Sequence, residues 1–290
     1  MARIARICRF PIKALSAEDL DRIEVSTGAT LPFDRRFAFG RVAPGQLGDA
    51  GAIMDGQAEW EPSGACEWQP PGNFFTLKRH ASLAALTAKF DRGASARVQI
   101  TGPDGAGVEA DMETAAGRAR ISLFVSDFLA LPDQSASRPW LMDAGRGRHF
   151  ADKQTPYISI INQASVDSIP LPDSSLPGQY PTDKPRDNGR PSLTASLINP
   201  LRFRGNLLVD GWKPWEEGSL PGKCLTVGSV RLRVIEPIGR CVATHVDPNS
   251  AHRDRNLLKT LQANFGHTNC GVYAVIEKGG TLLAGDTITY

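Results

Sequence analysis

The sequence lacks the features of a secreted, membrane-bound or zinc-binding protein. Its 290 residues include five cysteines. Their number is odd, their spacings are wide and no Cys-x-x-Cys pair occurs, which argues against a disulfide framework and a zinc site. No stretch approaches the roughly 18 apolar residues of a membrane span, and residues 1–11 hold no apolar run long enough for a signal peptide. We therefore expect a soluble, cytoplasmic protein with no membrane partner.

An excess of charge of one sign is also missing. Lys and Arg total 33 against 31 Asp and Glu, for a net charge of +2. A nucleic-acid-binding protein usually carries a clearly basic surface, so we expect no nucleic-acid partner. The arginines around positions 3–9 and 231–233 are interpreted as solvated strand faces. A few of the protein's arginines would still be enough to bind a small anionic ligand.

Most catalytic signatures are absent. There is no phosphate-binding Gly-x-x-x-x-Gly-Lys-Ser/Thr loop, no Gly-x-Ser-x-Gly elbow and no dinucleotide-binding Gly-x-Gly-x-x-Gly after a strand. His245 and Asp247 have the residue types of a base and its orienting acid. Their spacing does not enforce that geometry, so we interpret them as a local hydrogen-bonding arrangement beside Pro248.

What the sequence does contain is many short apolar runs separated by Gly and Pro turns, a pattern typical of barrels and sandwiches. The fold class predicted is mainly β with a few short helices. The strands are expected at residues 2–12, 23–25, 34–39, 74–77, 96–101, 157–161, 207–209, 225–227, 230–235, 272–277 and 287–290. Gly279-Gly280 predicts a hairpin turn. Helices are expected at residues 82–90, 117–130 and 256–265, the last one capped by Gly266.

Two proline-containing segments suggest the domain organisation. Asp, Gln and Ser gather between Pro132 and Pro139, which predicts a linker there and two domains, 1–131 and 132–290. The stretch 169–191 is rich in proline and is interpreted as an insertion inside the second domain. It either covers a ligand pocket or is a solvated decoration.

One cysteine has an unusual setting, in the segment Glu236-Pro-Ile-Gly-Arg-Cys-Val-Ala-Thr-His-Val-Asp-Pro248. A strand runs into Pro237, the chain turns through Gly239, and Cys241 follows Arg240 at the exit of the turn. A lone cysteine is usually a small buried hydrophobe. A neighbouring guanidinium, however, favours the thiolate, the form that attacks electrophiles and binds soft metals. Cys241 is therefore the candidate catalytic residue.

Four blocks between Arg202 and Asp286 resemble the MOSC-domain family, whose members handle the molybdenum cofactor. Arg202-Phe-Arg-Gly-Asn-Leu-Leu-Val-Asp-Gly211 is similar to the RFRPN block of MOSC domains. Gly239-Arg-Cys-Val-Ala-Thr-His-Val-Asp-Pro248 is similar to their block around SRC and VDP. The remaining two are Phe265-Gly-His-Thr-Asn-Cys-Gly-Val-Tyr273 and Gly280-Thr-Leu-Leu-Ala-Gly-Asp286. Four blocks in the family's order are far more specific than any single motif.

The N-terminal part agrees with this resemblance. Phe10-Pro-Ile-Lys13 resembles the YPVKS opening of the β-barrel that precedes MOSC in the amidoxime-reducing and hydroxylaminopurine-reducing members. Phe33-Asp-Arg-Arg-Phe37 and Asn73-Phe-Phe-Thr-Leu77 are similar to two later motifs of that barrel. The resemblance implies a β-barrel MOSC fold preceded by a smaller, β-barrel-like N-terminal domain.

The same resemblance implies a cofactor and a set of site residues. In this family a molybdenum atom is held by the dithiolene of a pterin and, in the reductases, by one protein cysteine, which here implies Cys241 as metal ligand. The pterin phosphate needs cations, and Arg binds phosphate through planar bidentate hydrogen bonds. The positions where the family contacts molybdopterin are Lys13, Arg35, Thr155, Arg204, Asn206, Arg240 and Tyr273.

Three functions remain open on this basis. The first is an oxidoreductase that reduces a small N-hydroxylated or N-oxide substrate. Since no flavin, haem or iron–sulfur motif is present, electrons would come from a separate carrier, ferredoxin-like or cytochrome b5-like. The second is a sulfur carrier or cofactor-handling protein with a persulfide on Cys241. The third is a non-enzymatic barrel that binds an anionic ligand, because a fold constrains the reaction only weakly.

Several departures from the family pattern bear on this choice. Ala14 and Gly239 stand where the family has serine, and each removes a hydroxyl that would bind phosphate or pterin. Gly205 replaces a proline. Cys270 is an additional thiol, either a reactive partner of Cys241 or a buried structural residue.

Overall fold

The computed structural model describes residues 1–43, 53, 66–91, 96–132, 136–170 and 198–290. The chain forms two compact units. Unit 1 comprises Met1–Cys8, Asp19–Pro32 and Tyr157–Tyr290, and unit 2 comprises Arg9–Glu18 and Phe33–Pro156. The boundary expected between residues 131 and 132 therefore falls inside unit 2. No helix in the described ranges is long and apolar enough to cross a membrane.

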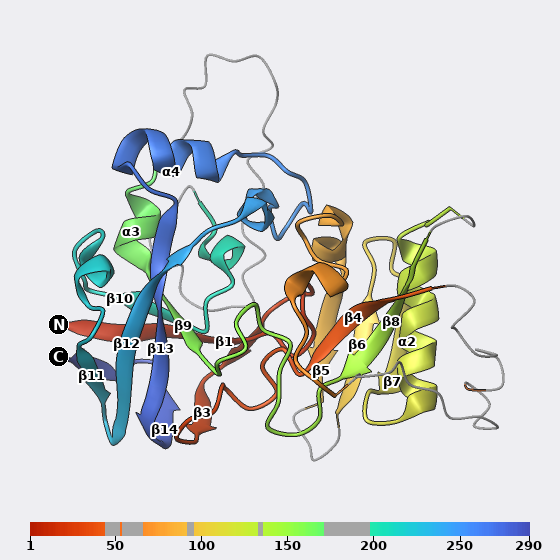
Figure 1. The fold of residues 1–290 in the computed structure, drawn as a ribbon, viewed down its shortest axis with the longest axis horizontal. Coiled ribbons are helices and arrows are strands. Elements are labelled where there is room, and N and C mark those ends of the chain that lie inside the picture. Colours follow the sequence, from red (N-terminus) through yellow and green to blue (C-terminus); the bar gives the residue numbers. More distant parts are fainter. Residues whose placement is uncertain (44–52, 54–65, 92–95, 133–135, 171–197) are drawn as a thin grey trace. The chain divides into compact units, whose positions relative to one another are not determined.

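Unit 1 is built on a closed β-barrel, which confirms the mainly β fold (Figure 1). The hydrogen-bonded order of its strands is β10 (Leu207–Asp210), β9 (Ile158–Asn162), β13 (Asn269–Lys278), β12 (Val230–Gly239), β11 (Cys224–Val227), β15 (Thr287–Thr289) and β1 (Ala2–Arg9). Antiparallel pairing of β1 with β10 closes the barrel, and β2 (Glu18–Leu20) adds to the other edge of β1.

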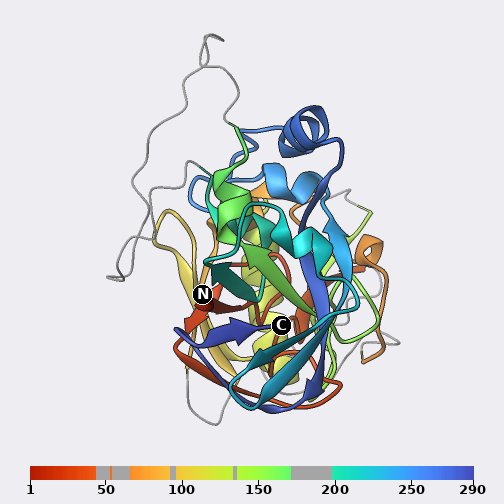
Figure 2. The same cartoon turned by 90° about the vertical axis from the view of Figure 1, so that its left-hand side faces the viewer.

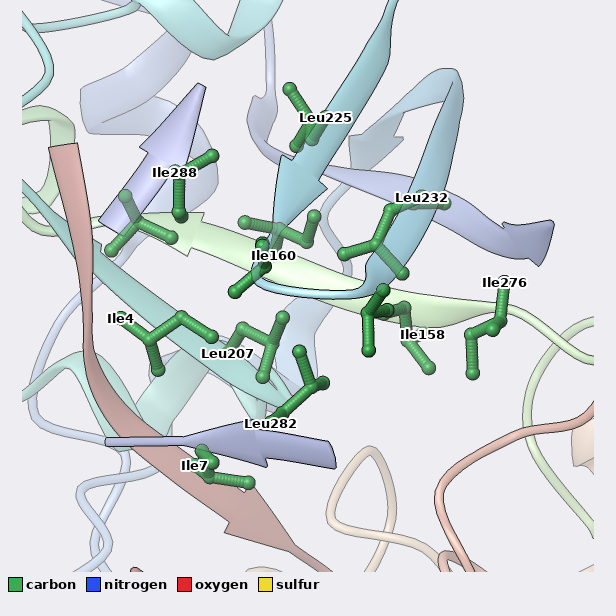
Figure 3. Packing of buried hydrophobic residues seen from close by; sticks show 14 of the residues in the cluster. Ile4, Ile7, Ile158, Ile160, Leu207, Leu225, Leu232, Ile276, Leu282 and Ile288 are labelled. Atoms are coloured by element: carbon green, nitrogen blue, oxygen red, sulfur yellow. The ribbon is translucent and has the colours of Figure 1, made fainter. Parts of the chain in front are cut away.

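Alternation along the strands fills the barrel. Val230, Leu232 and Val234 of β12 are fully buried, whereas Arg231 and Arg233 between them pair with Glu277 at the surface. This confirms the interpretation of those arginines as a solvated strand face. Figure 3 shows branched aliphatic side chains from the barrel strands meeting in the interior, as expected for residues that pack well on a pleated surface.

Two helices lie at one end of the barrel in both views (Figures 1 and 2), α3 (Gln163–Asp167) and α4 (Leu257–Phe265). The side chain of Asn256 accepts a hydrogen bond from the Lys259 amide at 3.1 Å and so caps the start of α4. Gly266 ends the helix with φ 74°, the conformation for which glycine has the lowest cost. The predicted helix 256–265 is thereby confirmed.

The hairpin predicted at Gly279-Gly280 is wrong. After β13 the chain does not fold back on it. Instead, β14 (Gly280–Leu283) pairs antiparallel with β3 (Arg22–Val25). A Cβ atom on Gly279 would lie 2.5 Å from the Val25 carbonyl oxygen. Glycine thus allows a close approach to a strand that is distant in sequence, and a glycine pair serves that purpose as readily as a tight turn.

The described part of unit 2 contains two small sheets and one long helix. In one sheet β4 (Phe37–Val42) pairs with β8 (Arg138–Asp143), and in the other β5 (Thr87–Phe90), β6 (Arg97–Thr101) and β7 (Gly107–Asp111) form a meander. The helix α2 (Ala115–Phe128) begins where the Thr114 hydroxyl accepts from the Gly117 amide at 3.0 Å. It confirms the helix predicted at 117–130.

Two predictions fail in unit 2. Residues 82–90 do not form a helix: a 3-10 turn, η3 (Ala81–Ala85), is followed by β5. Leu83, Leu86 and Phe90 have helical spacing, but Leu86, Ala88 and Phe90 fit a period of two, and pairing with β6 decides for the strand. At the strand expected over 74–77, only Phe74 forms an isolated bridge, with Gly40.

Candidate functional site

Three of the four MOSC-like blocks meet in unit 1. The Arg240 amide donates to the Thr268 carbonyl at 3.0 Å. The Arg240 guanidinium donates to the carbonyl of Cys270 through Nε at 2.7 Å and to the carbonyl of Phe203 through Nη1 at 2.9 Å. Arg240 therefore joins the end of β12 to β13 and to the 3-10 turn η4 (Pro200–Phe203).

Cys241 lies where these segments meet. It is separated from the end of β12 by Arg240 alone and directly precedes the 3-10 turn η6 (Val242–His245). Its carbonyl accepts from both the amide and the hydroxyl of Thr244, at 3.1 and 2.9 Å, so its backbone is held in place. The side chain is exposed as a free thiol. The site thus presents a soft donor atom to solvent from a fixed backbone.

A buried arginine clamps the turn η6, which follows Cys241. Arg202, at the end of η4, is 4% exposed. Its Nη1 donates to the His245 carbonyl at 3.1 Å, and its guanidinium binds both oxygens of Asp254 at 2.7 and 2.6 Å. Nη2 also donates to Asp247 at 2.5 Å. Since these partners lie within or just after η6, Arg202 fixes the chain that follows Cys241.

Sequence reasoning missed this clamp. Arg202 and Asp247 stand in two of the motif blocks, so a signal was available that they are special, but not that they pair. Asp254 carries no motif signal. A buried ion pair between residues far apart in sequence is visible only once the fold brings them together.

His245 and Asp247 do not act as a base and its orienting acid. Apart from Arg202, Asp247 accepts from the amides of Asn249 and Ser250 at 2.8 and 3.0 Å, closing its own turn. Burial lowers the pKa of His245, and the charges of Arg253 and Arg202 lower it further. The interpretation as a local hydrogen-bonding arrangement is confirmed.

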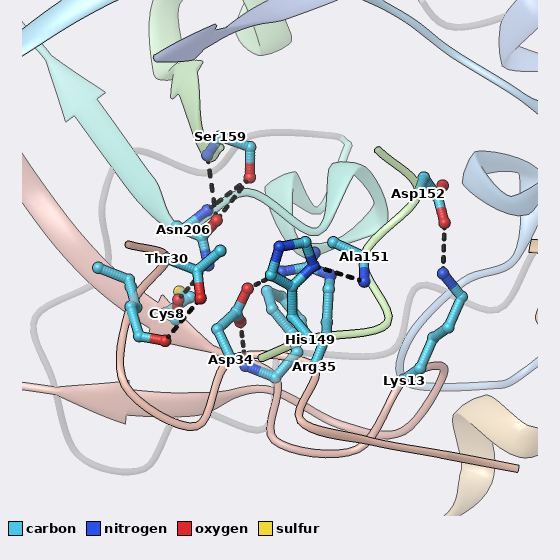
Figure 4. A network of polar contacts seen from close by, with 12 residues as sticks. Cys8, Lys13, Thr30, Asp34, Arg35, His149, Ala151, Asp152, Ser159 and Asn206 are labelled. Atoms are coloured by element: carbon cyan, nitrogen blue, oxygen red, sulfur yellow. Dashed lines mark hydrogen bonds and ion pairs between the residues drawn. The ribbon is translucent and has the colours of Figure 1, made fainter. Parts of the chain in front are cut away.

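Arg204 and Asn206 have different surroundings. Arg204 is half-buried and left-handed, with φ 50° and ψ 41°, directly after η4. Asn206 is 1% exposed. Its Oδ1 accepts from the amide and hydroxyl of Ser159 at 3.0 and 2.9 Å, and its Nδ2 donates to the Cys8 carbonyl at 3.3 Å (Figure 4). The expectation that Asn206 contacts a cofactor is not supported, because the chain itself uses this side chain.

Tyr273 is half-buried on β13, opposite Ser159 on one side and Glu236 on the other. Its ring stacks on that of Tyr157, with centroids 5.3 Å apart and an interplanar angle of 24°. The stack places two flat aromatic surfaces beside the barrel strands.

Cys270 is not a reactive partner for Cys241. It is 1% exposed. Burial raises the pKa of its thiol to about 12, against the opposing effect of the Arg240 charge. The thiol is protonated at neutral pH and inaccessible, so the structural reading holds.

Two candidate residues of unit 2, Lys13 and Arg35, are shown with their acidic partners in Figure 4. Lys13 is buried, and its Nζ donates to the Phe150 carbonyl at 2.8 Å and pairs with Asp152. Arg35 pairs with Asp34 and lies 4.8 Å from the centroid of the Phe10 ring. Both cations are thus held by the chain.

His149 adds a neutral group to this cluster. It is 7% exposed, and its Nδ1 accepts from the Ala151 amide at 3.2 Å. Burial lowers its pKa. The charges of Arg35 and Lys13 act in the same direction, whereas Asp34 opposes them. Sequence reasoning missed His149, which belongs to no motif block. Thr155 is exposed.

The protein alone offers no metal site in the described part of the chain. No group of three or more His, Cys, Asp or Glu side chains there could hold a metal ion. A metal bound by Cys241 would therefore need its other ligands from a cofactor.

Of the three departures from the family pattern, Gly205 has a clear structural reason. It is buried, and a Cβ atom there would lie 2.2 Å from Cγ1 of Ile161, itself 1% exposed. A side chain at this position requires a smaller neighbour. At Gly239 the nearest atom to an added Cβ is Asn269 Oδ1 at 3.7 Å, so a serine would fit there.

This predicts the effect of Gly205→Ala. The added methyl group overpacks the site, and we expect the free energy of unfolding to fall by about 1–3 kcal/mol in urea titrations. Adding Ile161→Val, which removes the outer methyl of the clashing branch, should restore part of the loss. Equal stability of Gly205→Ala and the unsubstituted protein would contradict this packing.

Comparison with known proteins agrees with this architecture. The MOSC N-terminal beta barrel domain model matches residues 1–144, and the MOSC domain model matches residues 147–289. Together they cover nearly all of the chain, which belongs to the MOSC-domain family.

The curated relatives are much longer proteins. Molybdenum cofactor sulfurase 2 of Culex quinquefasciatus is 34% identical over 117 residues, 39% of this chain and 13% of its own. The human molybdenum cofactor sulfurase is 24% identical over 159 residues, 53% of this chain and 18% of its own. This chain therefore spans less than a fifth of either relative. A crystal structure of the YUAD protein from Bacillus subtilis covers 99% of this chain and 93% of its own, at 13% identity and a TM-score of 0.38.

The proline-rich segment predicted as an insertion, 169–191, lies almost wholly outside the described residues, as do residues 133–135 of the expected linker. The last two residues of that linker, 138 and 139, belong to β8.

Proposed function

We propose that this protein binds the molybdenum cofactor and reduces a small N-hydroxylated or N-oxide substrate with electrons from an external carrier. The observation that carries the proposal is the exposed thiol of Cys241 on a backbone fixed by Thr244, Arg202 and Arg240. A metal ligand must keep its position while substrate and product exchange, and such a backbone provides this.

The donor set fits the cofactor. Thiolate is a preferred donor for soft metal centres, and the described residues contain no alternative cluster of metal-binding side chains. When bound, the cofactor supplies a dithiolene-held metal that accepts an oxygen atom. The chain supplies the thiolate of Cys241 and the cations for the phosphate.

The cations proposed to bind the phosphate differ in how they are already paired within the chain. Arg35 pairs with Asp34, whose side chain is 2% exposed and fixed by the Phe10 amide, so its charge is already balanced. Lys13 is buried, but its partner Asp152 is 60% exposed, so the carboxylate is well solvated and a phosphate can replace it. We infer that Lys13 contributes more to phosphate binding than Arg35.

The reaction consumes two electrons and two protons for each hydroxylamine reduced to an amine and water. The sequence carries no motif for flavin, haem or an iron–sulfur cluster, and the proposal therefore includes a ferredoxin-like or cytochrome b5-like donor.

A second function is favoured by a different observation. The curated relatives are named molybdenum cofactor sulfurases, and an exposed thiol on a fixed backbone also suits a persulfide. In this alternative Cys241 carries sulfur to the cofactor and does not reduce hydroxylamines. The missing hydroxyls at Ala14 and Gly239 favour it, since they remove groups that would retain a resident cofactor.

The test begins with the purified protein. Molybdenum and pterin content are measured, and reduction of an amidoxime is followed with an artificial electron donor. Stoichiometric molybdenum with turnover supports the reductase. A persulfide on Cys241 that moves to added cofactor, with no turnover, supports the sulfur carrier. A protein that takes up neither cofactor nor sulfur overturns both.

Removing one cation tests the phosphate contacts. A charge-assisted hydrogen bond contributes about 1.5–3 kcal/mol, so Arg204→Ala should weaken pterin retention by roughly 10–150-fold. Arg35→Ala should weaken it less. Arg3→Ala is the matched control, because Arg3 in the same unit as Arg204 pairs with Asp210 at the surface. Unaltered pterin content in Arg204→Ala would exclude this residue from the site.

A further inference from the structure

Unit 2 contains a second group of cations, none of which belongs to a motif block, although the ring that they contact, Phe75, does. Arg41 of β4 lies over the ring of Phe75, its guanidinium carbon 4.6 Å from the centroid. The same ring contacts the tilted imidazole of His80, at a centroid distance of 4.7 Å and an interplanar angle of 33°. The Nη2 atom of Arg41 is 3.3 Å from Nε2 of His80, and Nη1 donates to Ser137 Oγ at 3.2 Å. Phe75 therefore holds a guanidinium and an imidazole side by side.

Among the described residues, no carboxylate pairs with Arg41 or with Arg79, which is adjacent to His80. By contrast, Arg36, which directly precedes β4 in the same unit, pairs with Asp143 and Glu113. The Nε atom of Arg41 is buried and has no hydrogen-bond partner.

The surroundings lower the pKa of both Arg41 and His80. Burial lowers the pKa of Arg41, and the charge of Arg79 lowers it further. Burial also lowers the pKa of His80, as do the charges of Arg41 and Arg79. Partly desolvated cations without a counterion are unfavourable, and an anion placed among them would offset that cost.

From this arrangement we infer a binding site for a small oxyanion, a phosphate or carboxylate group, formed by Arg41, Arg79 and His80. A guanidinium presents the planar fork of donors that oxyanions bind. Arg79 is exposed and Arg41 is half-exposed, so an anion reaches them from solvent. The site goes beyond the proposed function and needs neither molybdenum nor pterin.

The size of the site favours a small anion. Its three members come from one strand and one turn, and the aromatic ring beneath them limits the contact to one face. An acidic protein would need cations spread over a larger surface, and it is one of the outcomes that the experiment distinguishes.

The test is a titration of the full chain with inorganic phosphate, and in parallel with acetate, at constant ionic strength. The imidazole resonances of His80 are followed by NMR, assigned with His80→Gln. We expect saturable shifts with phosphate, acetate or both. Arg41→Ala and Arg79→Gln should each weaken binding at least tenfold. Because Arg79 is exposed, Arg79→Gln reports on the site even if Arg41→Ala fails to fold.

Two controls separate this site from other phosphate contacts. Arg97→Ala removes an exposed arginine of the same unit that pairs with Glu109, and Arg35→Ala removes a proposed cofactor contact. Neither should change the His80 titration. Shifts that grow linearly with phosphate, that are equal in chloride, or that survive Arg41→Ala and Arg79→Gln overturn the inference. So does binding of an acidic polypeptide without any response to small anions.

Discussion

Replacing Cys241 by serine is expected to remove the sulfur-to-metal charge-transfer absorption and to reduce turnover to background. Serine places a hard, protonated hydroxyl where a soft thiolate donates. Loss of a group that merely supports a metal ligand costs about 10–100-fold, so loss of the ligand itself should exceed that. The variant should stay folded, because the thiol is exposed and the backbone contacts of Thr244 and Arg202 do not involve sulfur.

The measurement compares visible spectra and amidoxime reduction of Cys241→Ser with those of Cys66→Ser. Cys66 is the matched control, since it is also an exposed free thiol and belongs to no motif block. An unchanged spectrum in a cofactor-loaded Cys241→Ser protein would exclude the ligand role. A lost persulfide label, in a protein that never showed turnover, would instead assign Cys241 to the sulfur carrier.

Local sequence patterns predicted much of the barrel. Short apolar runs identified β9 and β10, whose residues are nearly all buried, and alternating apolar residues identified β12 and β13, which bury one face. Asn256 and Gly266 marked the two ends of α4. The patterns gave wrong predictions where pairing with a strand distant in sequence decides the local structure. Gly279-Gly280 is compatible with a hairpin and with a close crossing, and only the position of β3 selects the crossing.

In the candidate site, too, local features were predictable from the sequence, whereas contacts between distant residues were not. The motif blocks predicted the position of Cys241, since the thiol and its turn are local features. They could not distinguish a ligand-binding polar residue from one that binds the chain. Asn206 and Arg202 stand in the same block, yet both are buried against their own backbone or carboxylate partners. Which role applies depends on residues such as Ser159 and Asp254, distant in sequence.

Arg202 is the residue on which the geometry of the Cys241 turn depends most. Its side chain is 2% exposed, and the two carboxylates that it binds are each 19% exposed. Burying these charges is costly, and their mutual attraction offsets the cost only while all partners are present. Removing the cation takes away the partner that Asp247 and Asp254 share, and leaves only weaker contacts, Arg255 Nε at 3.5 Å from Asp254 and two backbone amides at Asp247.

We therefore expect Arg202→Ala to lower the free energy of unfolding by about 3–5 kcal/mol, as for other buried pairs that lose one partner. Urea titration followed by circular dichroism measures the change. Arg3→Ala, which breaks a pair whose arginine is 59% exposed, should cost less than about 1 kcal/mol. Combining Arg202→Met with Asp247→Asn and Asp254→Asn removes the uncompensated charge and should recover part of the stability.

In every variant that folds, the rate at which a thiol reagent modifies Cys241 reports on the turn. This rate should change in Arg202→Ala and not in Arg3→Ala. A loss below 1 kcal/mol with an unchanged rate would show that the turn is held without Arg202.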